Sequence, residues 1–373
     1  MKILIIHNFY KIDGGENRRV NEDILLYQQS NHEVLIYSKD NNQNVLIDIV
    51  YMIFSIFNPL VYFQVKKVLN DFNPDVIHIH NTWYKLGTAV YFAINKSSAK
   101  KFQSLHNLRF FCANAFMIRD DNECQLCLKS KWYSIKYKCY KNRLISGVSS
   151  FNSFLLKKFK VFNSNEFYFF SPNIFFSKLI KQYFNLSDDN ILGFPNYTND
   201  YYLYEKKEID VPENFLLIIG RDSSEKGFKQ FIENWNKIET NYSLVTIASN
   251  ENLFINSKNF KVLNHVTDEN LAYLYNNCQA VVVPSIWKEG FPRVIIEAMS
   301  VNKPILVSDL VEISNLDDLK DSLIKINLKS SESIKNAINS LKDFKTDSRS
   351  YFLENFTKEK YLMNITKYYE NQN

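Results

Sequence analysis

The hydrophobic positions of the chain form short continuous runs, and each run is separated from the next by a longer stretch with helical periodicity. Runs without polar alternation are typical of strands that are buried on both faces, and intervening helices favour parallel sheets covered on both sides. The predicted strands are KILIIH, EVLIYS, DVIHIH, FQSLH, FYFFS and ILGFP in the first half, and FLLIIG, YSLVTIAS, FKVLNHV, AVVVPS and KPILVSD in the second. The pattern therefore predicts an α/β protein with doubly wound sheets.

The strand pattern begins again at FLLIIG, after a charged and tyrosine-rich stretch. A chain of 373 residues exceeds the size at which one hydrophobic core keeps growing, so two domains are expected. We predict an N-terminal domain over 1–197, a linker over 198–214, a C-terminal domain over 215–345, and helices over 346–373 that pack back on the first domain. Ligands of such sheets bind beyond the carboxyl ends of the strands, so two facing sheets would form a binding cleft.

The composition is that of an ordinary globular protein, with 46% hydrophobic and 23% charged residues and a net charge of +5. This mild charge does not by itself indicate a nucleic-acid partner. The first ten residues begin a strand and lack the features of a signal peptide, so we expect a cytoplasmic protein. Residues 49–65 carry no charge, but Asn58 and Pro59 divide them, which favours a buried or surface-lying helix pair over a transmembrane helix.

Two glutamates, Glu289 and Glu297, lie on either side of a predicted helix start. AVVVPS ends a strand and Pro292 suits the first helical position, so one carboxylate lies in the loop and the other in the second turn. Eight helical positions span about 12 Å, comparable to the distance from sugar to ribose in a nucleotide-sugar. Backbone N–H groups around Gly290, Phe291 and Pro292 would face the anion between them. Carboxylates accept hydrogen bonds from hydroxyls, so the pair could hold two polyols; the alternative is two solvated surface residues.

The loop GRDSSEKG at 220–227 directly follows the strand FLLIIG. It places Arg221 and Lys226 at the carboxyl end of the sheet, where both could reach one anion. Two fixed cations there would stabilise the charge that develops on a diphosphate leaving group. Gly220 and Gly227 would let the backbone turn tightly. An ordinary surface loop with a glycine at the end of the strand is the alternative.

The first domain offers weaker signals at the ends of its strands. Gly14 and Gly15 follow the first strand and would let a backbone approach a phosphate or an acceptor closely. His106 follows the strand FQSL and could orient a sugar hydroxyl, whereas a histidine satisfied within the fold is the alternative. His80 and Asn81 lie near enough to their strand end to face the cleft.

The motifs GGEN at 14–17, PDVIHIHN at 74–81, LHN at 105–107, FPN at 194–196, GRDSSEKG and the glutamate pair occur in this order along nearly the whole chain. Together they resemble the retaining nucleotide-sugar glycosyltransferases of the GT-B fold, in family four. The resemblance implies two Rossmann-like domains, with Glu289 contacting hydroxyls of the donor sugar and Glu297 the ribose. It implies that Arg221 and Lys226 meet the leaving diphosphate and that His106 lies near C6 of the donor sugar.

Two further points follow from the resemblance. The chain contains no Asp-x-Asp pair, through which glycosyltransferases of the other main fold bind a divalent ion, so no cofactor is expected for catalysis. The leaving phosphate itself is expected to take the proton of the acceptor, and no catalytic base is assigned. The chain departs from the family at Arg293, where a small or apolar residue is common.

Four of the five cysteines, Cys112, Cys124, Cys127 and Cys139, have the spacing C-x11-C-x2-C-x11-C. A reducing cytoplasm argues against disulfides. Four thiolates at this spacing could bind a structural zinc ion, while free thiols and an iron–sulfur cluster stay open as alternatives. The flanking stretches LHNLRFFC, RDDNECQLCL and KCY resemble a subgroup of family-four enzymes of bacterial surface-polysaccharide pathways.

The segment from Lys129 to Asn165 contains nine Lys or Arg residues and no Asp or Glu. Basic residues are attracted to an anionic leaflet and aromatic rings favour the membrane interface, so the acceptor is predicted to be lipid-linked. A solvated helix face with aromatic core positions is the alternative, and the confinement of the charge to one segment argues against nucleic acid. The interleaved aromatic residues are Trp132, Tyr133, Tyr137, Tyr140 and Phe151.

The sequence as a whole predicts a cytoplasmic retaining glycosyltransferase of the hexosyltransferase type, peripheral on the inner face of the plasma membrane. It would move a sugar from a nucleotide-sugar, UDP-linked, to a lipid-linked oligosaccharide in the synthesis of O-antigen lipopolysaccharide or capsule. One alternative is a nucleotide-sugar epimerase of the same fold, which needs no lipid acceptor. The other is a zinc-containing nucleic-acid-binding protein.

Overall fold

The structure is a computed structural model of the 373-residue chain. It describes residues 1–11, 14–41, 45–163, 166–193, 196–221, 223–247, 259–264, 266–311 and 322–371, of which 45–49 and 371 are described by their backbone alone. The chain divides into two compact units. The N-terminal unit comprises Met1–Phe194 with Ile365–Asn373, and the C-terminal unit comprises Pro195–Asn364. Outside the described residues lie Phe194, Pro195, Asp222, Ala248, Ser249 and His265, which belong to motifs and runs quoted above.

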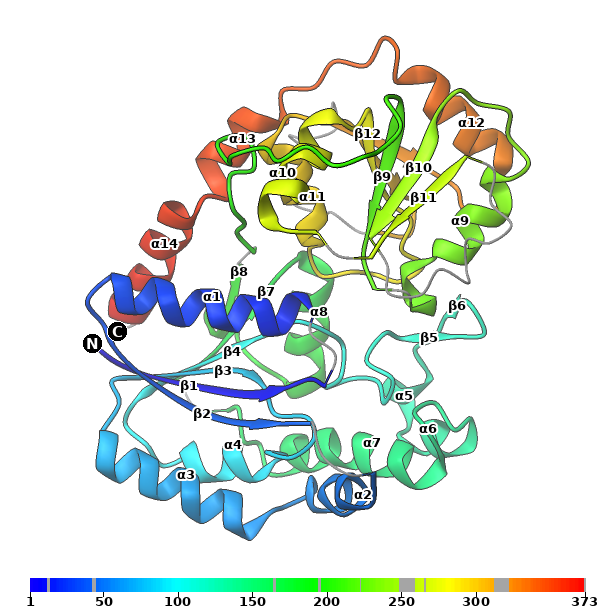
Figure 1. Ribbon diagram of the computed structural model, residues 1–373. Helices are drawn as coiled ribbons and strands as arrows, with labels where there is room; N and C mark the ends of the chain where they lie inside the picture. The colour runs from blue at the N-terminus through cyan, green and yellow to red at the C-terminus, as the bar shows by residue number, and fades with distance from the viewer. Residues whose placement is uncertain are drawn as a thin grey trace. The chain divides into compact units, whose positions relative to one another are not determined.

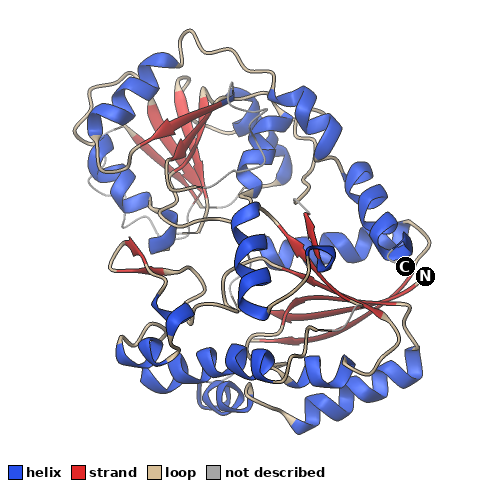
Figure 2. Cartoon of the chain, turned by 180° about the vertical axis from the view of Figure 1, so that it is seen from behind, coloured by secondary structure: helices blue, strands red, loops and turns tan. Residues whose placement is uncertain are grey.

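The N-terminal unit is built on a parallel sheet of six strands in the order β2-β1-β3-β4-β7-β8. Helices cover both faces of this sheet (Figures 1 and 2). Its central strands are completely buried, which explains why the sequence shows continuous apolar runs instead of alternation. The strands are β1 Lys2–Phe9, β2 Glu33–Asp40, β3 Val76–Asn81, β4 Lys100–Ser104, β7 Phe167–Ser171 and β8 Ile191–Gly193. The helices are α1 Gly15–Gln29, α2 Val45–Phe54, α3 Pro59–Phe72, α4 Ala89–Ile94, α7 Arg143–Lys158 and α8 Ile174–Phe184.

The uncharged stretch 49–65 forms the predicted helix pair, α2 and α3. The Asn58 side chain accepts hydrogen bonds from the backbone N–H groups of Leu60 and Val61, and Pro59 occupies the first turn of α3. Asparagine is a strong N-cap and proline cannot continue a preceding helix, so the break is fixed at this point. None of the helices in the described part of the chain is long and apolar enough to cross a membrane.

The C-terminal unit repeats the architecture with a second parallel sheet, in the order β11-β10-β9-β12-β13-β14. Helices α9 and α12 cover one face, and α10, α11 and α13 cover the other (Figure 1). The strands are β9 Phe215–Ile219, β10 Ser243–Ile247, β11 Phe260–Leu263, β12 Ala280–Val283, β13 Ile305–Ser308 and β14 Leu323–Ile326. The helices are α9 Phe228–Trp235, α10 Asp268–Asn277, α11 Arg293–Ser300, α12 Ser331–Ser340 and α13 Ser348–Asn355.

A small subdomain lies between β4 and α7 of the N-terminal unit and carries the four spaced cysteines. It consists of a two-stranded antiparallel hairpin and two short helices. These elements are β5 Ile118–Arg119, β6 Asn122–Glu123, α5 Leu126–Lys129 and α6 Trp132–Lys136.

The C-terminal segment divides between the two units. Helix α14 spans Lys358–Asn371, and its last turns belong to the N-terminal unit from Ile365 onward. The sequence predicts such a C-terminal helix that comes back to the first domain. There the ring of Tyr369 lies 4.8 Å from that of Phe102. In contrast, α13 contributes Phe352 to the core of the C-terminal unit. The segment 346–373 therefore does not pack on the first domain as one piece, because its first helix buries an apolar face elsewhere.

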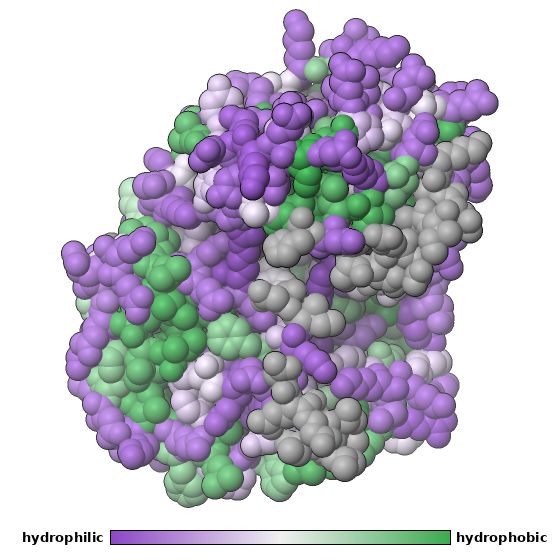
Figure 3. Space-filling model, in the orientation of Figure 1, coloured by the Kyte–Doolittle hydropathy of each residue, from purple (hydrophilic) through white to green (hydrophobic). Residues whose placement is uncertain are grey.

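Figure 3 shows hydrophobic residues gathered on one face of the N-terminal unit, over the end of α1 and the edge strand β2. Leu25 of α1 and Leu35 and Ile36 of β2 are exposed. Exposed apolar groups at a sheet edge are an unusual feature of a monomeric surface and are a candidate for contact with another chain.

Candidate functional site

The structure brings Lys226 and Glu289 into direct contact. Lys226 ends the short 3-10 helix η2, Ser224–Lys226, after β9, and Glu289 lies in the loop after the neighbouring strand β12. The Lys226 ammonium donates to Glu289 Oε1 at 2.8 Å, and the Ser285 hydroxyl donates to the same oxygen. Glu289 is almost completely buried. A buried carboxylate is thus held in one orientation at the carboxyl ends of two adjacent parallel strands.

Gly227 explains how the two loops come so close. Its φ is +68°, a left-handed conformation that glycine adopts without strain, and a Cβ there would lie 1.9 Å from the carbonyl oxygen of Pro284. The Ile286 N–H also donates to the Glu225 carbonyl at 3.0 Å. At Gly220 a Cβ would lie 3.2 Å from the ring of Phe228. The predicted need for glycines in this loop therefore has a specific cause, which is backbone-to-backbone packing at Gly227.

Arg221 and Lys226 contact different carboxylates in this structure. The Arg221 guanidinium lies 3.5 Å from Glu225 Oε1, and the hydroxyl of Ser223 donates to that oxygen at 2.6 Å. The Arg221 side chain is half-exposed, whereas the carboxylate of Glu225 is buried. The two cations lie in the same loop, but they do not converge on one point.

Glu297 is buried on α11 and has three polar neighbours. The Tyr275 hydroxyl donates to Oε2 at 2.5 Å, and the Thr198 hydroxyl lies 3.4 Å from Oε1. Arg293, the departure noted in the sequence, places its Nε 3.8 Å from Oε1, one helical turn before the carboxylate. Burial, and then the charge of Glu297, raise the pKa of Tyr275 well above its usual 10.0, so its hydroxyl stays protonated and donates.

The start of α11 differs by one residue from the prediction, because the helix begins at Arg293 and Pro292 is its N-cap. Such a difference lies within the ordinary uncertainty of helix ends. Phe291 is buried against Phe356, with 5.3 Å between ring centroids, so its side chain serves the core. Only the backbone of Gly290, Phe291 and Pro292 is therefore a candidate for contact with an anion.

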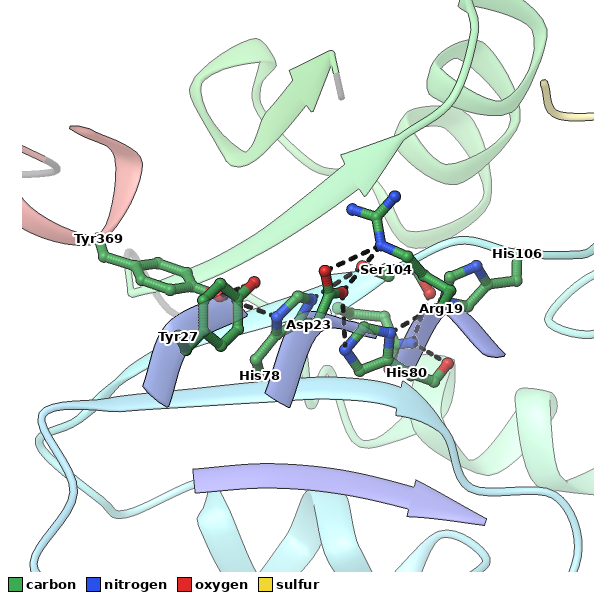
Figure 4. A network of polar contacts seen from close by, with 9 residues as sticks. Arg19, Asp23, Tyr27, His78, His80, Ser104, His106 and Tyr369 are labelled. Atoms are coloured by element: carbon green, nitrogen blue, oxygen red, sulfur yellow. Dashed lines mark hydrogen bonds and ion pairs between the residues drawn. The ribbon is translucent and has the colours of Figure 1, made fainter. Parts of the chain in front are cut away.

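A buried polar network lies above the N-terminal sheet, between α1 and the strands β3 and β4 (Figure 4). Arg19 and Asp23 form an ion pair at 2.9 Å, and His80 Nε2 lies 3.9 Å from the same aspartate. His80 Nδ1 and His106 Nε2 are 3.1 Å apart, so one ring donates to the other. Burial lowers the pKa of His106 to about 3 and that of His80 well below 6.5, so both rings are neutral near pH 7. His106 can therefore orient a hydroxyl but cannot supply a positive charge.

The same network reaches the end of the chain. The Tyr369 hydroxyl and His78 Nδ1 are 2.8 Å apart, and Tyr369 also lies 3.3 Å from the Tyr27 hydroxyl (Figure 4). His78 Nε2 contacts the Ser104 hydroxyl at 2.8 Å. These contacts tie the last turn of α14 to β3 and β4, which gives His78 a structural role.

Gly14 and Gly15 stand at the start of α1, where Gly14 is an N-cap with extended backbone. A Cβ at Gly15 would meet nothing within 4 Å. The fold itself therefore does not require glycine there, and the space beside this backbone is open to a ligand.

The four spaced cysteines, for which a structural zinc ion is predicted, lie in and beside the small subdomain. Cys112 and Cys127 are buried, while Cys124 and Cys139 are partly buried. A hydrogen bond between Cys127 and Cys112 lowers the pKa of the Cys112 thiol to about 6, with Arg109 as a lesser cause. Within the described ranges, no group of three or more His, Cys, Asp or Glu side chains could hold a metal ion. Burial, and then the nearby Cys112 and Cys124, raise the pKa of the Cys139 thiol, so the four cysteines lie in one neighbourhood. A zinc ion bound by them stays a prediction.

Sequence reasoning missed three residues that shape these sites. Ser285 ends the run AVVVPS four positions before Glu289, so the spacing could have indicated it. Arg109 follows His106 by three residues and lines a cavity described below. Tyr275 lies on the preceding helix, and its contact with Glu297 depends on tertiary packing that no local pattern signals.

Comparisons with known proteins agree with this geometry. Residues 203–359, which contain Arg221, Lys226, Glu289 and Glu297, match the family Glycosyl transferases group 1. The O-antigen chain mannosyltransferase RfbU of Salmonella typhimurium is 29% identical over 141 residues, which cover 35% of this chain. The alignment spans only 39% of the length of that curated relative.

Solved structures match over the whole chain. Sucrose-phosphate synthase from Thermosynechococcus elongatus is 14% identical with a TM-score of 0.72, covering 99% of this chain and 98% of its own. HepE from Anabaena, in complex with UDP and glucose, is 16% identical with a TM-score of 0.65 and covers 99% of both chains. UDP-GlcNAc 2-epimerase from Methanocaldococcus jannaschii is 14% identical with a TM-score of 0.54, covering 99% and 100%. These likenesses confirm the predicted fold class, two Rossmann-like α/β domains of the GT-B type.

Proposed function

We propose that the protein is a retaining glycosyltransferase that takes its sugar from a nucleotide-sugar, UDP-linked, bound by the C-terminal unit. The observation that carries the proposal is the contact between Lys226 and the buried carboxylate of Glu289 at the carboxyl ends of β9 and β12. This edge of a parallel sheet is where such folds bind ligands. The match of residues 203–359 to a glycosyltransferase family supports it.

The two groups have complementary roles in this proposal. Glu289 accepts a hydrogen bond from a hydroxyl of the donor sugar. Lys226 and the half-exposed Arg221 face the diphosphate, whose negative charge grows as the glycosidic bond breaks, so they stabilise the transition state more than the ground state. The leaving phosphate takes the proton of the attacking hydroxyl, which requires neither a protein base nor a metal ion.

Glu297 holds the ribose in this proposal, and its two oxygens differ in how firmly they are bound. Oε2 receives the short contact from Tyr275 at 2.5 Å, whereas Oε1 has longer contacts at 3.4 Å with Thr198 and 3.8 Å with Arg293. Oε1 is therefore the oxygen that can accept hydrogen bonds from ribose hydroxyls. Tyr275 fixes the carboxylate while this happens.

The acceptor is proposed to be a lipid-linked glycan at an anionic membrane surface, in the synthesis of O-antigen or capsule. Support comes from exposed apolar residues on α3 and α7 of the N-terminal unit, next to the basic segment 129–165. Helix α2 packs against α7, and Phe92 contacts both Phe57 and Phe159, so these helices share one surface. Basic groups beside exposed apolar groups are typical of peripheral membrane binding. The exposed residues are Leu60, Phe63, Leu144, Phe151, Phe154 and Phe159.

Vesicle sedimentation tests the membrane part of the proposal. The protein should bind vesicles containing anionic lipid, bind purely zwitterionic vesicles much more weakly, and lose binding in the variant Phe63→Ser. The matched control is Leu353→Ser, which replaces an exposed apolar residue of the C-terminal unit. Equal binding of all three proteins to both kinds of vesicle would contradict the proposal.

The catalytic proposal is tested by incubating the protein with a panel of nucleotide-sugars, with and without a lipid-linked glycan. A transferase lengthens the glycan, whereas an epimerase of the same fold changes the sugar without any acceptor. The variants Lys226→Ala and Glu289→Gln should abolish most of the transfer, while Lys229→Ala, an exposed lysine of the same unit, should not. Sugar conversion in the acceptor-free reaction would replace the transferase assignment by the epimerase.

A further inference from the structure

The N-terminal unit contains a cavity of about 60 Å³ that the catalytic proposal does not use. It lies at the carboxyl ends of β3 and β4, and residues of α4 and α7 complete its wall. The cavity is partly open to solvent, so part of a ligand larger than this volume can enter it. The residues that matter here are His80, Trp83, Tyr91, His106, Arg109 and Asn152.

Besides His80, whose Nε2 lies 3.9 Å from Asp23 without a hydrogen bond, two buried side chains in the cavity wall have polar atoms that lack a hydrogen-bond partner among the described residues. They are the indole N–H of Trp83, which is 5% exposed, and Oδ1 of Asn152, which is 9% exposed. The orientation of Asn152 is fixed, because its Nδ2 donates at 3.0 Å to the hydroxyl of Ser55, which in turn donates to the Met52 carbonyl. Buried polar groups normally have partners. The wall therefore offers one donor and one acceptor to a ligand with both kinds of group, as a sugar has.

Arg109 adds a positive charge to the same wall. Its Nη1 donates to the Ala113 carbonyl at 2.7 Å, and its buried Nε has no partner among the described residues. The guanidinium carbon lies 5.0 Å from the ring centroid of Trp83 and 4.9 Å from that of Tyr140. These aromatic faces hold the guanidinium in place. No carboxylate of the described chain pairs with it.

The remaining groups of the wall do not cancel this charge. Among the residues that the structure describes, no Asp or Glu lines the cavity. His80 and His106 are neutral, because burial lowers their pKa values. A cation in a water-excluding wall is stabilised by an anion, and a guanidinium binds planar or tetrahedral oxyanions through its parallel N–H groups.

We propose that this cavity binds an anionic sugar residue, with its carboxylate or phosphate oxygens on Arg109 and Trp83 and a hydroxyl on Asn152. The inference rests on the proposed function, because it assigns this sugar residue to the acceptor glycan. Tyr91 supplies an apolar ring to the wall, against which the C–H face of a sugar packs. The protein thus selects acceptors that carry a negative charge near the position of transfer.

The two sources of the anion are distinguished by ligand. Binding to the full-length protein is measured by saturation-transfer NMR with glucuronic acid, which supplies a carboxylate, glucose 1-phosphate, which supplies a phosphate, and glucose, which is neutral. At least one of the two anionic sugars should bind at millimolar concentration, and glucose should bind much more weakly. Glucose binding as tightly as the anionic sugars, or no binding by either of them, would overturn the proposal.

Three variants locate the site. Arg109→Gln should weaken binding of the anionic sugar by about 10- to 100-fold, the size expected when a hydrogen bond between charged groups is lost. Asn152→Asp keeps the shape of the side chain but adds a negative charge, so it should weaken the anionic sugar and leave glucose unchanged. Cys112→Ser removes a thiol whose ionisation Arg109 favours, and it should not weaken binding.

The matched control is Arg119→Gln. Arg119 also lies over an aromatic ring, 4.0 Å from the centroid of Tyr137, but it is outside the cavity. This variant should bind the anionic sugar like the parent, and an equal loss in Arg119→Gln and Arg109→Gln would overturn the assignment. Circular dichroism of each variant confirms that it is folded. Binding of UDP by the parent protein is measured separately, so that failure of the proposed donor site is distinguishable from failure of this one.

Discussion

The contact between Lys226 and Glu289 makes a quantitative prediction about the stability of the C-terminal unit. The two groups are 2.8 Å apart, and their side chains are 23% and 6% exposed. Breaking a fully buried pair costs about 3–5 kcal/mol when one charge is left behind, whereas exposed pairs contribute about 0–1 kcal/mol. Because the lysine is partly exposed, we expect Lys226→Ala to cost about 2–3 kcal/mol, since it leaves the buried carboxylate without its cation.

Glu289→Gln should cost less, about 1 kcal/mol. The lysine then turns toward solvent, and the Ser285 hydroxyl still has an oxygen to donate to. The double variant leaves no buried charge without its partner. Its loss in free energy of unfolding should therefore be smaller, by about 1–2 kcal/mol, than the sum of the losses in the two single variants. The control cycle uses Lys229 and Glu233, an exposed pair at 4.0 Å on one helix, whose coupling should be below about 0.5 kcal/mol.

The assay is urea unfolding followed by tryptophan fluorescence, with one transition fitted for each unit of the chain. A coupling energy within error of zero for Lys226 and Glu289 would refute the reasoning, because the two groups would then not interact in solution. Transfer activity is measured on the same proteins. Loss of one electrostatic group at a developing charge lowers kcat by about 100- to 1,000-fold, so Lys226→Ala with full kcat would make the pair a purely structural one.

Three further predictions concern single positions. Gly227→Ala should destabilise the C-terminal unit by about 1–3 kcal/mol or more in urea unfolding, because it combines a left-handed backbone with a backbone clash. Tyr275→Phe should weaken UDP binding about 10-fold by calorimetry, because Glu297 loses its protonated donor. Burial lowers the pKa of His106 from 6.5 in the unfolded chain to about 3 in the folded protein. The stability that the neutral ring contributes to the folded protein is therefore complete above pH 6.5, and it is lost as the pH falls from 6.5 toward 3. His106→Gln should therefore flatten the decline of the free energy of unfolding in that window by up to about 1.4 kcal/mol per pH unit, measured by urea unfolding at each pH.

Much of the fold could be predicted because the sheets are buried on both faces, which leaves continuous apolar runs. All eleven predicted runs overlap a strand of the structure. The twelfth parallel strand, β14, was missed because it lies at a sheet edge and carries Lys325 within LIKI, so its pattern does not read as a buried run. The hairpin β5–β6 was missed because two-residue strands have no periodicity.

Site residues that directly follow strands could be predicted from the sequence. Contacts between side chains that depend on tertiary packing could not. Lys226 and Glu289 follow neighbouring strands, so the topology alone brings them to one edge. The separation of Arg221 from that pair depends on a local ion pair with Glu225, which the spacing does not reveal. The zinc site stays a prediction, since cysteine spacing says nothing about whether the intervening chain lets four thiols converge.

The carboxylate of Glu289 is held in place by other side chains of the C-terminal unit. Folding removes Glu289 from water, and Lys226 and Ser285 fix the orientation of its carboxylate. In the proposed mechanism a hydroxyl of the donor sugar therefore meets a hydrogen-bond acceptor that is already oriented and is not covered by water. Such preorganisation favours catalysis because little rearrangement is needed as charge develops. The Lys226 ammonium has three N–H donors, so in the proposed mechanism it can keep its contact with Glu289 and also donate to the diphosphate. In that arrangement the attraction between the ammonium and the diphosphate grows as the glycosidic bond breaks, so the interaction contributes most in the transition state, where the diphosphate carries the greater charge.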